Sequence, residues 1–175
     1  MNHVIKKAYD KIYKRLFGLK RYLIKKGVNI GNNCYIYSDI STTESYLITL
    51  GNNVTVAGKV TFITHDNSIC KPLPDKSDIF GKINIGNNCF IGNGATVLYG
   101  VTIADDNIIS AGAVVTKSVL STGNIIAGNP AKIIGKVSDF AKKGGEYAVN
   151  ISGLKSKEKK EFIEKSKLYE RKPME

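Results

Sequence analysis

An aliphatic residue recurs at every sixth position through the middle of the chain. From Ile85 the sequence divides into the hexads IGNNCF, IGNGAT, VLYGVT, IADDNI, ISAGAV, VTKSVL, STGNII and AGNPAK. Their first residues are Ile85, Ile91, Val97, Ile103, Ile109, Val115, Ser121 and Ala127. Six of these eight are β-branched aliphatics, which favour short extended strands. The fifth residues are mostly small or apolar, and the second is often glycine or alanine.

The same phase appears upstream in IGNNCY and IYSDIS from Ile30 and in LGNNVT and VAGKVT from Leu50, with a slip of two residues around 44–49. A period of six fits neither a helix nor the two-residue alternation of a simple strand. It predicts a short strand, a tight corner and another strand, so that three hexads close a triangular coil of about 18 residues. The predicted fold is therefore an all-β solenoid, with first-position side chains inside and Gly, Asn and Asp at the corners.

The two ends of the chain have a different pattern. Residues 1–27 place apolar side chains at near-helical spacing between lysines, and this predicts a basic amphipathic N-terminal helix. Two roles stay open for it: packing across the coil or a neighbouring subunit, which we favour, and peripheral contact of residues 1–24 with the inner membrane. The coil spans 28–137, and 138–175 form a C-terminal extension with a charged amphipathic helix after Ser156.

Composition narrows the class of protein. The 175 residues suit one domain with appendages, and the absence of a long apolar run or a signal-peptide pattern predicts a soluble, cytoplasmic protein. The net charge of +11 divides into +8 for residues 1–27, zero for 28–137 and +3 for 138–175. Because the folded middle is electrically balanced and carries no nucleic-acid motif, nucleic acid is not an expected partner.

The cysteines and histidines limit the chemistry further. Cys34, Cys70 and Cys89 are odd in number and lack Cys-x-x-Cys spacing, so neither a disulfide framework nor a metal site is predicted. Cys34 and Cys89 fall on fifth positions and are expected to be inert core thiols. The chain has only two histidines, and one of them, His65, lies where the hexads break into a proline-containing loop, 67–82. A loop of this length is expected to cover a binding site, although a plain insertion is the alternative.

These motifs resemble the hexapeptide-repeat acyltransferases, most specifically in INIGNNCFIGNGATVLYGVTIADDNIISAGAVVTK followed by IIAGNPAKIIG. The likeness covers 28–137 and is greatest to the sugar O-acetyltransferases, including those of surface polysaccharides. It implies a left-handed parallel β-helix, a homotrimer with active sites between subunits, acetyl-CoA as donor and a sugar or glycan precursor as acceptor. Acetyl transfer to an amino sugar or to serine, or a non-catalytic scaffold, are the alternatives. The γ-class carbonic anhydrases, built on the same coil, bind zinc through three histidines, and two are too few.

The resemblance also implies roles for the residues around the loop. His65, in Thr-His-Asp, matches the general base that takes the proton of the acceptor hydroxyl and returns it to the leaving thiolate. An ordinary solvated loop histidine is the alternative. Asp66 is expected to orient the imidazole or bind the acceptor, or else to serve a neighbouring subunit or cap the turn.

Cofactor-binding positions carry over in the same way. Asn93 matches a small polar residue beside the pantetheine arm, and Ala111 matches a backbone amide that meets the cofactor. The remaining matched positions are Thr116, Lys117, Lys132 and Gly135. Lysines suit this role because coenzyme A carries several phosphate charges. Phe90 occupies an aromatic position near the site.

Overall fold

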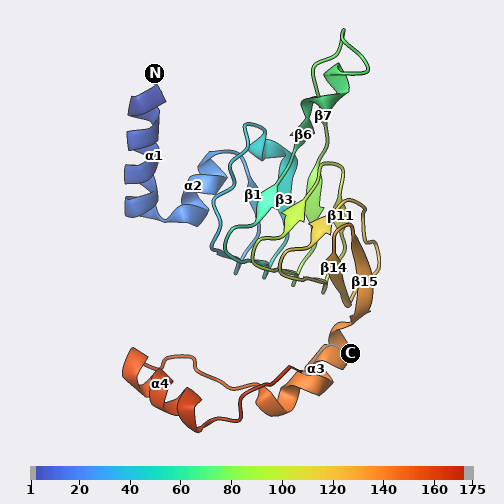
Figure 1. The fold of residues 1–175 in the computed structure, drawn as a ribbon. Helices are drawn as coiled ribbons and strands as arrows, with labels where there is room; N and C mark the ends of the chain where they lie inside the picture. Colours follow the sequence, from blue (N-terminus) through green and yellow to red (C-terminus); the bar gives the residue numbers. More distant parts are fainter. Residues whose placement is uncertain (1–2, 172–175) are drawn as a thin grey trace. The chain divides into compact units, whose positions relative to one another are not determined.

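The computed structural model describes residues 3–171 and divides the chain into two compact units, Met1–Val137 and Ser138–Glu175 (Figure 1). The first unit contains two N-terminal helices and a coil of short strands. The second contains the C-terminal helices.

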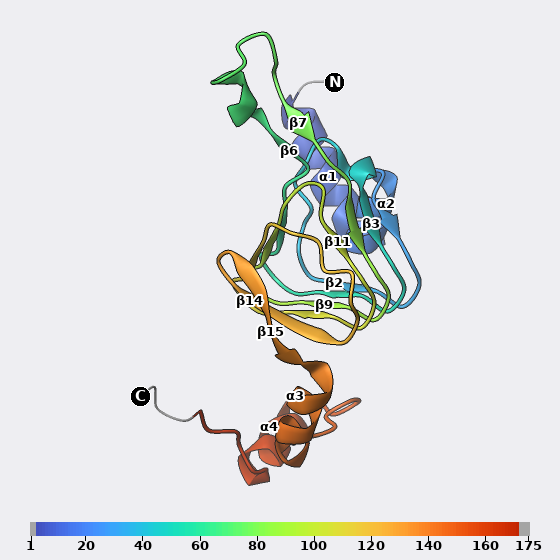
Figure 2. The same ribbon diagram turned by 90° about the vertical axis from the view of Figure 1, so that its right-hand side faces the viewer.

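Parallel strands stack into three sheets, which form the sides of the coil. The sheets have the orders β1-β3-β8-β11, β5-β10-β13 and β2-β4-β9-β12-β14, with β15 added antiparallel beside β14. Figure 2 shows the triangular path of successive turns. The strands are β1 (Asn29–Ile30), β2 (Tyr35–Ile36), β3 (Ile48–Leu50), β4 (Thr55–Val56), β5 (Thr61–Phe62), β8 (Ile83–Ile85), β9 (Phe90–Ile91), β10 (Thr96–Val97), β11 (Thr102–Ile103), β12 (Ile108–Ile109), β13 (Val114–Val115), β14 (Asn124–Gly128) and β15 (Ala131–Lys136).

The six-residue period sets the core. Thr96 pairs with Val114 and Phe90 with Ile108, so each coil in this region repeats after three hexads. First-position side chains from Ile85 to Val115 are all buried. The fifth positions Cys89, Ala95, Val101, Asn107 and Ala113 are buried as well. The interior is therefore built as the pattern predicts, through Val115.

The last two predicted hexads are wrong. Ile103 pairs with Val119 rather than with Ser121, and Ile109 pairs with Ile126 rather than with Ala127. Ser121 is exposed, and AGNPAK spans the turn of the antiparallel hairpin β14–β15 together with the strand residues on either side of it. Buried side-chain amides accommodate the shorter coil, because Asn107 Oδ1 accepts the Asn124 backbone N–H at 2.8 Å and Asn107 Nδ2 donates to the Ser121 carbonyl at 2.9 Å.

Corner residues explain the recurrent Gly-Asn-Asn. A Cβ on Gly86 would lie 2.3 Å from Asp105 Oδ1 in the next coil, so only glycine permits the close stacking. Asn88 and Asp106 adopt positive φ values of 54° and 61°, a conformation that Asn and Asp tolerate. Their side chains also stack, since Asn88 Nδ2 donates to Asp106 Oδ1 at 2.7 Å.

The N-terminal segment forms two helices instead of the single predicted one. α1 (His3–Phe17) and α2 (Leu19–Lys25) are separated by Gly18, whose φ of 82° breaks the helix. α2 lies against β1 and β2 of the first coil, and it buries Tyr22 and Leu23 in the same core as the strands. It is therefore α2 that packs against the coil, and it covers one end of the solenoid (Figure 1).

The C-terminal unit is small, and most of its described residues are exposed. It contains most of α3 (Val137–Gly144), the short 3₁₀ helix Gly145–Tyr147 and α4 (Ser156–Lys165), and α4 confirms the helix predicted after Ser156. Tyr147 and Tyr169 meet edge to face with ring centroids 5.0 Å apart, and Lys167 Nζ pairs with Glu146 at 3.0 Å.

Truncation of the capping side chain should destabilise the coil. Leu23 is fully buried, so Leu23→Ala is expected to lower the free energy of unfolding by about 2–5 kcal/mol through lost burial and the cavity left behind. The adjacent Ile24, 47% exposed on the same helix, is the matched control, and Ile24→Ala should change it by less than about 1 kcal/mol. Urea unfolding of both variants measures the difference. Equal effects at the two positions would contradict a capping role for α2.

Candidate active site

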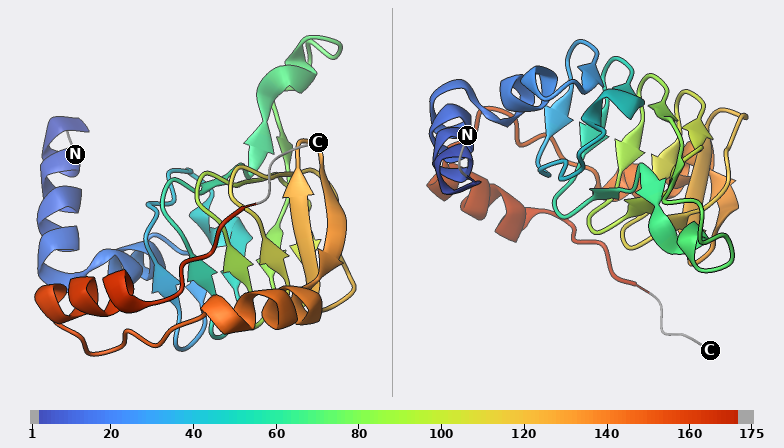
Figure 3. Two further views of the ribbon diagram at one scale, coloured as in Figure 1. Left: turned by 60° about the horizontal axis from the view of Figure 1, so that its bottom comes forward. Right: turned by 90° about the horizontal axis from the view of Figure 1, so that it is seen from above.

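His65 lies where an arm leaves the coil. After β5 the chain continues into β6 (His65–Asp66), which pairs antiparallel with β7 (Ile79–Phe80), and the 3₁₀ helix Asn67–Cys70 follows β6. The Gly81 N–H donates to the Thr64 carbonyl at 3.0 Å and closes the base of the arm. Figure 3 shows the arm projecting from the coil. The predicted loop 67–82 therefore forms most of this arm, with the histidine at its base.

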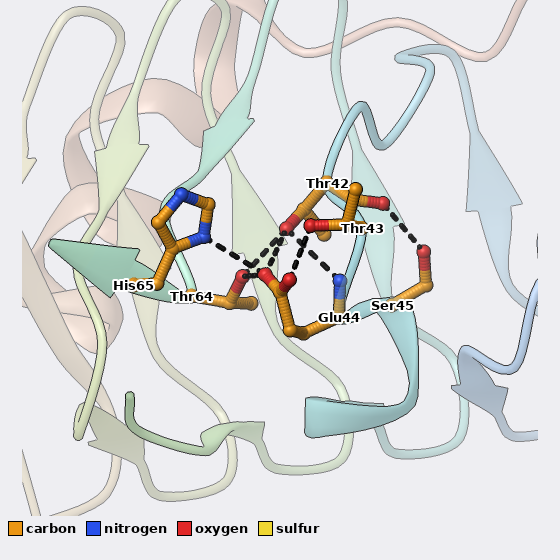
Figure 4. A network of polar contacts seen from close by, with 6 residues as sticks. All are labelled: Thr42, Thr43, Glu44, Ser45, Thr64 and His65. Carbon is orange, nitrogen blue, oxygen red and sulfur yellow. Dashed lines mark hydrogen bonds and ion pairs between the residues drawn. The ribbon is translucent and has the colours of Figure 1, made fainter. Parts of the chain in front are cut away.

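The imidazole of His65 contacts a carboxylate that sequence reasoning missed. His65 Nδ1 lies 2.8 Å from Glu44 Oε2 (Figure 4). The same oxygen accepts hydrogen bonds from the hydroxyls of Thr64 at 3.0 Å and Thr42 at 3.1 Å. Thr43 donates to the other carboxylate oxygen. The imidazole is 42% exposed, whereas Glu44 is only 14% exposed. The site is thus a solvent-accessible histidine backed by a largely buried carboxylate.

These hydrogen bonds determine the charge of Glu44. The hydroxyl of Thr43, followed by the Thr64 hydroxyl and His65, lowers the pKa of Glu44 to about 2, although burial acts in the opposite direction. The carboxylate is therefore ionised near neutral pH and can only accept hydrogen bonds. It follows that His65 Nδ1 is the donor in this pair, and that the other ring nitrogen, Nε2, points away from Glu44 (Figure 4).

The irregularity in the hexad pattern builds this arrangement. Asn29 pairs with Thr49 and Ile30 with Leu50, so the first coil contains the two residues that break the period. The extra length lies between β2 and β3, in the segment that contains the 3₁₀ helix Ser45–Leu47, where the Ser45 hydroxyl donates to the Thr42 carbonyl at 3.0 Å. The slip around 44–49 was the available signal for Glu44, but the pattern alone did not indicate which side chain would turn toward His65.

Asp66 faces a different set of partners. Its Oδ1 accepts the Ser68 backbone N–H at 2.8 Å, and its Oδ2 accepts the Tyr99 hydroxyl at 3.3 Å. The bond from Ser68 is the main reason that the pKa of Asp66 is lowered. Of the roles expected for this residue, the geometry matches the turn cap, whereas Glu44 is the carboxylate that contacts the imidazole.

One corner of the coil gathers three of the expected cofactor positions. Register places Asn93 beside Ala111 in the next coil, and the Gly112 N–H donates to the Asn93 carbonyl at 2.9 Å. Lys132 pairs with Ala127, which extends the same corner on the terminal hairpin. Asn93, Ala111 and Lys132 are all exposed. Gly135 lies further along β15, opposite Ile125.

Thr116 and Lys117 belong to a different corner. They follow β13 directly, and both are exposed. Because β5, β10 and β13 are in register, the equivalent positions two coils away are Ile63 and Thr64, immediately before His65. The structure therefore brings Lys117 to the edge of the sheet from which the arm leaves. Asn93 and Ala111 lie at the opposite edge of the same sheet.

The cysteines on fifth positions face the core region. Cys89 is buried, which raises the pKa of its thiol, and its Sγ lies 3.2 Å from the Ala104 carbonyl. Cys34 is half-buried, with its Sγ 3.1 Å from the Gly51 carbonyl. A raised pKa disfavours the reactive thiolate at Cys89.

Comparisons with known proteins agree with this fold. The signature of the bacterial transferase hexapeptide family (six repeats) matches residues 82–117. Protein CapG from Staphylococcus aureus is 42% identical over 166 residues, which cover 91% of this chain and 94% of that protein. Galactoside O-acetyltransferase from Escherichia coli K12 is 32% identical over 113 residues, or 64% of this chain and 55% of that protein.

Two solved structures share the architecture. A maltose O-acetyltransferase from Clostridium difficile 630 superposes with a TM-score of 0.58 at 24% identity, covering 77% of this chain and 89% of that one. A galactoside acetyltransferase in complex with coenzyme A gives a TM-score of 0.56 at 22% identity, covering 78% and 77%. Since the match to CapG extends over almost the whole chain and the signature falls on the stacked hexads, the chain belongs to the hexapeptide-repeat acyltransferase family, together with the sugar O-acetyltransferases.

Proposed function

We propose that this protein transfers an acetyl group from acetyl-CoA to a hydroxyl of a sugar, such as a unit or precursor of a capsule or other surface polysaccharide. The observation that carries the proposal is the His65–Glu44 pair at the base of the arm. The names of the relatives, galactoside and maltose O-acetyltransferases, support a sugar acceptor. Coenzyme A in a solved structure of the same fold supports the donor.

His65 acts as the general base in this proposal. With Nδ1 donating to Glu44, the lone pair of neutral imidazole is on Nε2, the nitrogen that points away from the carboxylate. Nε2 removes the proton of the acceptor hydroxyl as its oxygen attacks the carbonyl carbon of the thioester. The C–S bond then breaks, and the imidazolium returns the proton to the thiolate sulfur. No acyl-enzyme is formed, which is compatible with the core position of Cys89.

Glu44 is a positioning residue in this scheme. It holds the imidazole in one tautomer and orientation, and its negative charge stabilises the imidazolium that forms during attack. The three threonine hydroxyls fix the carboxylate in turn. Asp66 stabilises the turn at the start of the arm, and its half-buried position near Tyr99 leaves contact with the acceptor as a secondary proposal.

The donor would bind along the exposed corners. Asn93 and the Ala111 amide would meet the pantetheine arm, and the ammonium groups of Lys117 and Lys132 would pair with phosphates. Thr116 and Gly135 complete this expected set.

A homotrimer would unite the two sets of residues. In one chain, Lys117 and Asn93 lie at opposite edges of the sheet β5-β10-β13. A neighbouring subunit whose Asn93 corner faces the His65 corner would complete a site between them. This geometry, together with the family resemblance, supports a trimeric, left-handed β-helix whose active sites lie between subunits.

Removal of the imidazole should abolish most of the activity without unfolding the protein. His65→Ala is expected to lower kcat with acetyl-CoA and a galactoside or maltose acceptor by about 10²- to 10⁴-fold. A thiol reagent detects the released coenzyme A. Light scattering measures the size of the oligomer, and thermal unfolding shows whether the variant is folded. Acetyl-CoA should still raise the Tm of the variant, because the donor contacts are intact. Turnover near that of the wild type would disprove the assignment.

Loss of the Glu44 charge should lower kcat while leaving the binding of acetyl-CoA almost unchanged. Glu44→Gln is expected to lower kcat by about 10- to 100-fold, as for loss of a hydrogen bond to a charged group, with little change in KM for acetyl-CoA. Glu44→Asp should recover part of the rate, since it restores the charge. Steady-state kinetics on the three proteins separate positioning from a structural role, in which kcat would follow stability and the aspartate would give no recovery.

The ionised network also predicts how stability depends on pH. Because folding lowers the pKa of Glu44 from 4.5 to about 2, its stabilising contribution is complete above pH 4.5 and is lost as the pH falls toward 2. The difference in free energy of unfolding between wild type and Glu44→Gln should therefore shrink below pH 4.5. Urea titrations at several pH values measure it, with Asp75→Asn, an exposed carboxylate of the arm, as the control for charge. A difference that stays constant would exclude this source of stability.

A further inference from the structure

Helix α1 presents a row of apolar side chains to solvent. Ile5, Ala8, Ile12 and Leu16, here called the outer stripe, follow the spacing that places residues on one helix face. Ile5 and Ile12 are each 58% exposed and Leu16 is 69% exposed. A row of exposed apolar side chains that runs over about three helical turns is unfavourable in water unless something covers it.

The outer stripe is not the face by which α1 is held to the rest of its unit. Tyr13 is partly buried against the core and contacts Tyr22 of α2, with ring centroids 6.3 Å apart. Lys14 forms an ion pair with Asp39 and lies over the Tyr22 ring, 4.4 Å from its centroid. Lys25 of α2 donates to the Tyr9 hydroxyl. These contacts hold α1 by another face, so the side chains of the outer stripe stay exposed.

Positive charge borders the outer stripe. Lys7, Lys11 and Arg15 form the helical row next to Ala8, Ile12 and Leu16. A cleft of about 430 Å³ between α1 and α2 is lined by Lys6, Lys7, Lys11, Lys14 and Lys26, together with Asp10, Tyr22, Asp39 and Ser41. Residues 1–27 carry nine Lys and Arg side chains against one Asp. An apolar row beside a basic row is the arrangement that binds anionic lipid surfaces.

We propose that α1 docks the enzyme on an anionic lipid surface, with the outer stripe inserted at the level of the head groups and the adjacent basic row in contact with their charges. α2, whose Leu23 is fully buried, connects this surface helix to the coil. The attachment is peripheral: among the helices of residues 3–171, none is long and apolar enough to cross a bilayer.

A second copy of α1 is a poorer occupant of the outer stripe. Two such helices packed face to face would bring together segments that each carry a charge of +8, and the basic rows would repel one another. An anionic lipid surface matches both the apolar row and the charge.

Vesicle binding tests the proposal directly. Full-length protein should co-sediment with vesicles that contain about a third phosphatidylglycerol, and much less with phosphatidylcholine alone. Ile12→Ser with Leu16→Ser should lower the partition coefficient roughly tenfold, because less apolar surface is buried. Lys11→Gln with Arg15→Gln should lower it at least about tenfold, and added salt should weaken binding of the wild type.

Matched variants in the other unit serve as controls. Lys157→Gln with Lys159→Gln changes the net charge by the same amount on α4, and it should leave partitioning unchanged. Light scattering of the Ile12→Ser, Leu16→Ser protein detects a change of oligomeric state, and its turnover with a soluble acceptor should equal that of the wild type. The proposal is overturned if the wild type does not bind anionic vesicles, if the outer-stripe variant binds them equally well, or if that variant loses subunits instead.

Discussion

The stacking of one short coil on the next is the constraint on which the rest of this protein depends. Each coil obtains its backbone hydrogen bonds and its apolar contacts from the coils above and below. A fixed register therefore places every side chain, and a glycine such as Gly86 is required where two corners approach. The same constraint leaves two ends that must be closed. α2 buries Leu23 at the first, and the antiparallel hairpin β14–β15 ends the coil at the other.

The candidate active site lies where the register is interrupted. A regular coil directs its side chains only inward or outward, and adjacent corners differ little from one another. The two additional residues of the first coil allow Glu44 to turn toward the next coil, and the arm releases the chain at His65. The contact between them joins residues that are 21 positions apart in sequence. Two separate departures from the repeat thus meet at one point and create a polar site on an otherwise repetitive surface.

Much of the fold could be predicted from the period, because burial of aliphatic first positions such as Ile91 and Val97 is a local rule repeated many times. Prediction failed where a local pattern competed with a long-range contact. Ser121 was predicted to continue the period, yet the last coil is shorter, and the buried Asn107 and Asn124 amides hydrogen-bond within it. Glu44 was missed for the same reason, since its partner is fixed only when the coils stack. Gly18 was visible in the sequence, but the basic amphipathic pattern assigned to residues 1–27 favoured one continuous helix.

At the end of a solenoid, unlike along its sides, a segment can pack on the core without following the register of the coils. A helix that covers the first coil needs only one buried face, and α2 supplies it through Tyr22 and Leu23. Because α2 closes the core, the residues that precede it in the chain do not have to follow the register of the stacked coils. The break at Gly18 then lets α1 turn a different face outward, with Tyr13 and Lys14 holding it in place. The period of six thus positions His65 and Glu44, whereas the helical period of α1 places its apolar residues on an outward face without disturbing the register of the coils.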